Sequence, residues 1–103
     1  MANKEKDQIR SNLLYESFLT LQNAEECKNF LKDLCTMSEL RAMEQRMEVA
    51  VLLSEGMIYN DILERTGASS ATISRVNRAL QYGADGYQTV LPRIQGLLAD
   101  EEK

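Results

Sequence analysis

The stretch of sequence that decides the fold is Gly67-Ala68-Ser69-Ser70-Ala71-Thr72-Ile73-Ser74-Arg75-Val76. A helix-turn-helix needs two helices at a steep angle, a tight turn and apolar residues that lock the pair together. Gly67 suits the turn because a left-handed backbone costs little for glycine, and Ala68 is small enough to pack beneath it. Ile73 and Val76 lie three residues apart and form an inner helix face. The stretch therefore predicts the turn and second helix of a helix-turn-helix over about residues 59–80.

The opposite face of that second helix carries small, polar and basic side chains. Short polar side chains at a helix start reach base edges without blocking close approach, and the helix N-terminus offers free N–H groups to phosphate. Arginines add phosphate contacts or read guanine bidentately. The residues predicted to contact DNA are Ser69, Ser70, Ala71, Thr72, Ser74, Arg75 and Arg78.

A helical hairpin that merely completes a bundle is the alternative interpretation of this segment. It explains the apolar residues Ile62, Ile73 and Val76 equally well. It does not explain why serine, threonine and arginine gather on the other face. We therefore favour DNA binding in the major groove.

The charge of the chain is unfavourable for a nucleic-acid ligand, since 12 basic and 16 acidic residues give a formal net charge of −4. Phosphate contacts need clustered lysine or arginine, so the local distribution matters more than the total. Residues 59–80 contain two acidic residues and three arginines, a local charge of +1 (3 − 2). Residues 68–80 contain two arginines and no acid.

Helical spacing of apolar residues extends over almost the whole chain, which predicts an all-α fold of five to six short helices. The apolar positions of the first three helices are Ile9, Leu13, Leu14, Phe18 and Leu21, then Cys27, Phe30, Leu31 and Leu34, then Leu40, Met43, Met47, Ala50, Val51 and Leu53. We expect the second of these helices to bury its four apolar residues.

Capping signals mark where several of these helices begin and end. Asn23 with Glu26, and Thr36 with Glu39, have the spacing of helix starts. Gly56 is expected to end the third helix. A fourth helix is expected from about Asn60 to Thr66 and a fifth from Ser69 or Ser70 to about Tyr82.

The C-terminal part is expected to form a further helix from Tyr87 to Leu98, after breaks at Gly83 and Gly86. Pro92 lies inside this segment. A proline either kinks a helix or begins a new one, and the sequence leaves both open.

Length and composition limit the function classes. The 103 residues predict one domain, and a chain this short is a candidate for stabilisation by a partner chain. No apolar run approaches the roughly 18 residues of a membrane span, and the N-terminus leads into no apolar signal core. We expect a cytoplasmic protein.

The inventory of reactive side chains argues against an enzyme or a metal protein. There is no histidine, so neither a four-ligand zinc site nor a Cys-His nucleophile can be assembled. We expect Cys27 and Cys35 to be small core residues rather than a disulfide. We predict no catalytic residues, no metal ligands and no cofactor.

In the predicted helix-turn-helix and in the helix before it, the sequence resembles the tryptophan repressor superfamily, and most closely its YerC/YecD-type branch. The strongest match comprises Gly67-Ala68, Ala71-Thr72-Ile73-Ser74-Arg75 and Leu80. A second match comprises Thr36, Glu39, Arg46, Val49, Leu52-Leu53 and Gly56. The resemblance to the branch extends from about Leu14 to Tyr87, and between Gly56 and Gly67 this chain is one residue shorter than the repressor.

The resemblance implies an intertwined, all-helical homodimer that offers one recognition helix per subunit to double-stranded DNA. It also implies a ligand pocket, because Arg46 and Arg75 match the two arginines that flank the repressor's bound tryptophan. An ordinary ion pair of Arg46 with Glu39 or Glu44 is the alternative.

The sequence departs from the repressor where the ligand would lie. Val76 stands where the repressor has a glycine against the indole, and Ala79 stands where it has a serine near the ligand's amino group. A stiff β-branched side chain would take the space that the indole needs. We therefore expect no response to tryptophan, whereas a smaller anionic effector held by Arg46 and Arg75 stays open.

The leading prediction is a sequence-specific transcriptional regulator that occupies an operator. The alternative is an interaction adaptor without DNA binding, whose helical surface would use Met37, Met43, Met47 and Met57. Methionine at helical spacing is more often core filler, which favours the regulator.

Overall fold

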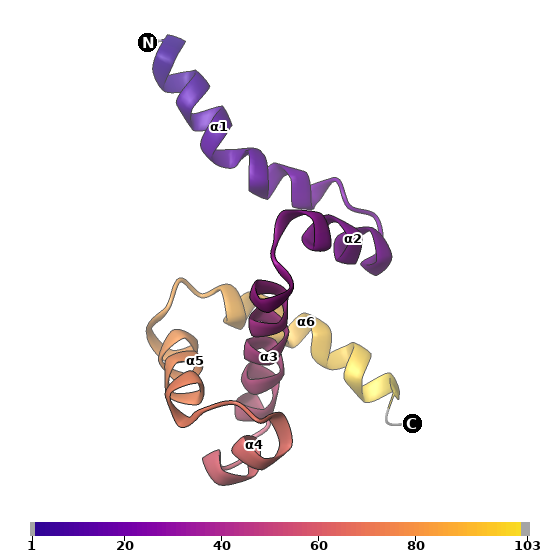
Figure 1. Ribbon diagram of the computed structural model, residues 1–103, viewed down its shortest axis with the longest axis vertical. Coiled ribbons are helices and arrows are strands. Elements are labelled where there is room, and N and C mark those ends of the chain that lie inside the picture. The colour runs from indigo at the N-terminus through magenta and orange to yellow at the C-terminus, as the bar shows by residue number, and fades with distance from the viewer. Residues whose placement is uncertain (1, 102–103) are drawn as a thin grey trace. The chain divides into compact units, whose positions relative to one another are not determined.

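The first 40 residues form a compact unit that contains two helices, α1 (Ala2–Leu19) and α2 (Ala24–Leu34). The computed structural model describes the backbone of residues 2–101 and the side chains of residues 5–95. The unit also includes the first turn of α3 (Met37–Ser54), which continues into the second unit. Figure 1 shows the order of these helices along the chain.

Both predicted helix starts in this unit are confirmed. The Glu26 N–H donates to Asn23 Oδ1 at 2.9 Å, and the Glu39 N–H donates to Thr36 Oγ1 at 3.1 Å. The Thr36 N–H donates back to Glu39 Oε1 at 2.8 Å, which completes a capping box. The pKa of Glu39 is lowered mainly by this backbone hydrogen bond and, to a smaller extent, by the hydrogen bond with the Thr36 side chain. The carboxylate's contribution to stability is therefore present at neutral pH and lost as the pH falls through that lowered pKa.

The two helices meet through one aromatic contact, in which the rings of Phe18 and Phe30 lie edge to face with centroids 5.3 Å apart. The expectation that α2 buries all four of its apolar residues is wrong within the single chain. Cys27, Phe30 and Leu31 are half-buried, and Leu34 is 51% exposed. Leu34 stays exposed because no other segment of this unit covers that part of the apolar face of α2.

The second unit, residues 41–103, packs α3 with α4 (Tyr59–Thr66), α5 (Ser70–Tyr82) and α6 (Gly86–Glu101). Its core joins residues from all four helices and from the turn between α4 and α5. The buried residues of this core are Val49, Ala50, Leu52, Ile62, Ala68, Ile73, Val76 and Leu91. The two helices of the predicted helix-turn-helix therefore rest on α3 and α6.

The buried face of α3 agrees only in part with the expected one, since Leu40 and Ala50 are buried as expected but other buried residues were missed. Val49 is fully buried and Leu52 is 5% exposed, whereas the expected core residues Val51 and Leu53 are only half-buried. Apolar residues lie all round the second half of α3, so periodicity alone does not select the face that meets α4, α5 and α6.

The C-terminal segment forms one continuous helix, so the alternative in which Pro92 begins a second short helix is wrong. Pro92 lies inside α6, where it cannot donate a backbone hydrogen bond to the carbonyl of Gln88. Gly86 does not break the pattern as expected but is the first residue of α6.

The described residues form six helices and no strand, which confirms the all-α prediction. None of the helices in this part of the chain has the length and apolar character that a bilayer-spanning segment needs.

Candidate nucleic-acid interface

The turn between α4 and α5 has the predicted geometry. Gly67 ends α4 with φ 72° and ψ 4°, in the left-handed region, and its N–H donates to the Leu63 carbonyl at 2.9 Å. The Thr66 hydroxyl donates to the Ile62 carbonyl at 2.7 Å and accepts from the Ala68 N–H at 3.1 Å. Ala68, the residue after the turn glycine, is 2% exposed and therefore packs in the core.

The turn is also tied to α3, a contact that sequence reasoning missed. Gln45 Nε2 on α3 donates to the Thr66 carbonyl at 3.3 Å. A threonine directly before the turn glycine is a signal that could have identified Thr66. Nothing in the sequence marks Gln45, because the contact joins residues 21 apart.

Replacing Gly67 by alanine should lower the free energy of unfolding by about 1–2 kcal/mol, the cost of a left-handed backbone for a residue with a β-carbon. A β-carbon at Gly67 would meet no atom within 4 Å, so backbone strain rather than a steric clash causes the loss. Urea denaturation of the variant measures it.

Gly86→Ala is the matched control. Gly86 also has open space around a β-carbon, but its φ lies outside the left-handed region. Its replacement should leave stability unchanged or raise it by about 0.4–1 kcal/mol through the unfolded state. Equal destabilisation of both variants would contradict the role given to the Gly67 backbone.

Ser69 is the N-cap of α5. Its hydroxyl oxygen accepts from the Thr72 N–H at 3.1 Å, and the hydroxyl donates to Thr72 Oγ1 at 3.0 Å. Thr72 is half-buried beside this cap. The two hydroxyls therefore fix the start of the helix, and their contact with DNA stays a prediction.

The inner and outer faces of α5 separate as the sequence indicates. Ile73 and Val76 are 0% and 1% exposed in the core. The exposed residues among the predicted DNA contacts are Ser69, Ser70, Ala71, Ser74, Arg75 and Arg78. Four of these, Ala71, Ser74, Arg75 and Arg78, line one shallow hollow on the outer face.

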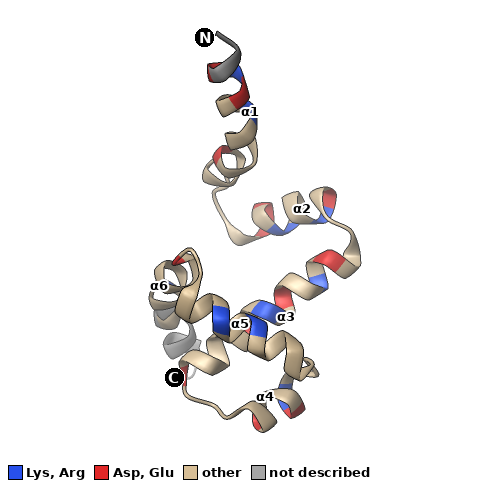
Figure 2. Cartoon of the chain, turned by 90° about the vertical axis from the view of Figure 1, so that its left-hand side faces the viewer, with Lys and Arg blue, Asp and Glu red and all other residues tan. Residues whose placement is uncertain are grey.

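The electrostatics of α5 favour an anionic partner. Its 13 residues include two arginines and no carboxylate, and its first turn holds no acid to oppose the positive end of the helix dipole. Figure 2 shows these two basic bands on α5, while α4 carries both signs of charge. A helix start of this kind attracts phosphate.

The two arginines of the predicted ligand pocket lie in different surroundings. Arg46 is half-buried on α3. Arg75 is exposed and borders the outer hollow with Arg78. Val76, the residue predicted to take the space of a ligand ring, lies in the core. Whether the two guanidinium groups share a ligand stays a prediction.

Comparison with known proteins gives one family. The model of the Trp repressor protein family matches residues 10–95. The chain is 49% identical over 92 residues to the uncharacterised protein YerC of Bacillus subtilis, an alignment that covers 89% of this chain and 84% of YerC.

Two crystal structures resemble the chain in sequence and in fold. One is of a proposed Trp repressor from Staphylococcus aureus, with 44% identity and a TM-score of 0.79, covering 84% of this chain and 86% of that one. The other is of a TrpR-like protein from Eubacterium eligens, with 47% identity and a TM-score of 0.78, covering 90% of this chain and 95% of that one. The chain therefore belongs to the Trp repressor protein family.

Proposed function

We propose that the chain is a sequence-specific DNA-binding transcriptional regulator that inserts the N-terminal part of α5 into the major groove. The observation that carries this proposal is the division of α5 into two faces. One is locked into the core by Ile73 and Val76, and the other presents two arginines, small polar residues and no carboxylate. A helix that only completed a bundle would have no need of the second face. Membership of the Trp repressor family supports the same assignment.

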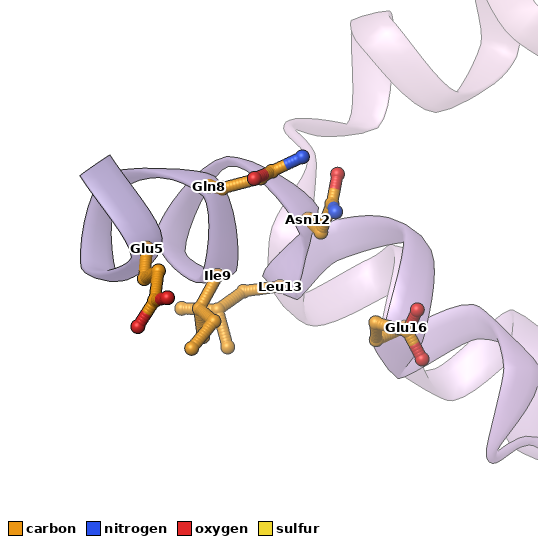
Figure 3. A pocket seen from close by; sticks show the side chains of 6 residues that line it. All are labelled: Glu5, Gln8, Ile9, Asn12, Leu13 and Glu16. Carbon is orange, nitrogen blue, oxygen red and sulfur yellow. The ribbon is translucent and has the colours of Figure 1, made fainter. Parts of the chain in front are cut away.

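We also propose that the active form is a homodimer. Large apolar side chains lie on several sides of α1 and are exposed: Ile9, Leu13, Leu14, Tyr15 and Leu19, at 63%, 57%, 40%, 63% and 79%. Exposed large apolar side chains gathered on one helix mark a surface that another protein covers. Figure 3 shows Ile9 and Leu13 side by side on α1 with their ends in open space. A second copy of the chain is the occupant that the family implies for this surface.

A two-fold dimer of this kind presents two copies of α5. Recognition helices of helix-turn-helix dimers enter successive major grooves about 34 Å apart, so the DNA site should be pseudo-palindromic.

DNA affinity measured against salt concentration tests the proposal. Fluorescence anisotropy with a selected DNA duplex should show affinity that falls steeply as salt rises. Arg78→Ala should lower the slope of log affinity against log salt by about one unit for each phosphate that the arginine neutralises. Arg93→Ala is the control, since it removes an exposed charge from α6 rather than from α5. An absence of DNA binding at low salt would contradict the proposal and favour a protein adaptor.

Tryptophan should neither bind this protein nor strengthen its DNA binding. Val76 is packed among Ile62, Ile73 and other core residues, so admitting an indole beside Arg75 would require moving a buried side chain. Calorimetric titration with L-tryptophan, with and without DNA, measures this. Saturable binding at micromolar tryptophan together with tighter DNA binding would overturn the interpretation of Val76.

A further inference from the structure

We infer that Arg75 reads a guanine in each half of the DNA site, whereas Arg78 contacts a phosphate. The inference rests on the proposed function and deepens it, because it assigns base identity to one side chain. Both arginines border the outer hollow of α5 together with Ala71 and Ser74. The question is which of the two guanidinium groups lies nearer the base edges.

The distance of each residue from the start of the helix separates the two arginines. With a rise of about 1.5 Å per residue, Arg75 begins about 7.5 Å from Ser70 along the helix axis and Arg78 begins about 12 Å from it. The N-terminal residues of a recognition helix contact the bases. Arg75 is therefore within one side-chain length of the first turn, and Arg78 lies nearer the edge of the groove.

Side-chain direction strengthens this difference. Side chains on a helix lean toward its N-terminus and lie over the residue three or four positions earlier. Arg75 therefore leans over Ala71, which is exposed and ends at its β-carbon. A longer residue at position 71 would fill the hollow through which Arg75 reaches the first turn.

The chemistry of the exposed side chains indicates which DNA base Arg75 reads. A guanidinium offers a rigid fork of donors that matches the O6 and N7 acceptors of guanine in the major groove. The hydroxyls of Ser70 and Ser74 both donate and accept, so they distinguish bases poorly. Because α5 has no carboxylate, no residue of this helix competes for the Arg75 fork. Arg75 therefore determines most of the base preference of α5.

The test compares selected duplexes with and without the guanine. After selection from random DNA defines the site, one conserved guanine per half-site is replaced by adenine or by 7-deazaguanine, which lacks the N7 acceptor. The unmodified protein should lose affinity about 5- to 150-fold for each guanine that adenine replaces, and it should lose affinity for 7-deazaguanine as well. Arg75→Ala should bind guanine and adenine duplexes equally, and Arg75→Lys should keep charge but lose most of the preference.

Arg78→Ala is the matched control, because it is an exposed arginine of the same helix and the same hollow. It should bind all duplexes more weakly by the same factor and keep the guanine preference. If Arg75→Ala keeps the preference, or if Arg78→Ala loses it, the inference is wrong while the proposed function stands. If the protein binds none of the duplexes, the proposed function fails and the inference fails with it. Circular dichroism of each variant verifies that the helices are intact.

Discussion

Replacing Ile73 by alanine should lower the free energy of unfolding by about 2–5 kcal/mol, the range for removing a large aliphatic side chain from a packed core. Ile73 is 0% exposed and lies with Ile62 and Val49 where α3, α4 and α5 meet. Removing the methyl and methylene carbon atoms leaves a cavity where α3, α4 and α5 meet, and α5 would have to move to fill it. Chemical denaturation at fixed protein concentration measures the change, because the stability of a dimer depends on concentration.

Ser74→Ala is the control for this prediction. Ser74 follows Ile73 directly, lies on the same helix and is exposed. Its replacement should change stability by less than about 0.5 kcal/mol. Equal destabilisation by the two substitutions would contradict the assignment of inner and outer faces on α5, and with it the placement of the DNA-contacting residues.

Replacing Leu13 by lysine should dissociate the proposed homodimer at low micromolar concentration. Leu13 is 57% exposed on α1 and would be buried by the second copy. Full burial of a leucine contributes about 1.5–3 kcal/mol, so covering the part of Leu13 that is exposed in the single chain contributes about 0.9–1.7 kcal/mol. The dimer contains two copies, so the loss is about 1.7–3.4 kcal/mol, which raises the dissociation constant about 20- to 300-fold. Desolvation of the lysine charge adds to the loss.

Light scattering measures the result. The unmodified protein should give about twice the 11.7 kDa mass of the chain, and Leu13→Lys should approach the mass of one chain. Asn12→Lys is the control, because it places the same charge one residue away at an exposed polar position. A monomeric unmodified protein would contradict the dimer, and a Leu13→Lys variant that stays dimeric would exclude α1 from the interface.

The helix-turn-helix could be predicted from sequence because its signals are local. A glycine needed at a left-handed turn, a serine cap three residues before Thr72, and Ile73 and Val76 on one face all act within about ten residues. The observed helices of this segment are α4, from Tyr59 to Thr66, and α5, which runs from Ser70 to Tyr82 and so ends two residues beyond the predicted span of about residues 59–80. The capping box of Thr36 and Glu39 was predictable for the same reason.

The features that depend on long-range packing were not predictable. Periodicity assigned Leu34 to the interior, but exposure depends on what other chain segments cover that face. It missed Val49 and Leu52 because the apolar surface of α3 is broad, and only the positions of α4, α5 and α6 select the buried side. The hydrogen bond from Gln45 to Thr66 joins two elements and has no signature in either of them.

Selection of bound duplexes from a random DNA pool by the purified protein shows directly whether it recognises a specific DNA sequence. The result expected is enrichment of one pseudo-palindromic site whose half-sites lie one helical turn apart, at about 10–10.5 base pairs from centre to centre. Arg78→Ala should enrich the same site with less yield. Enrichment of sites without two-fold symmetry would contradict the paired docking of α5, and no enrichment at all would contradict DNA recognition by this protein.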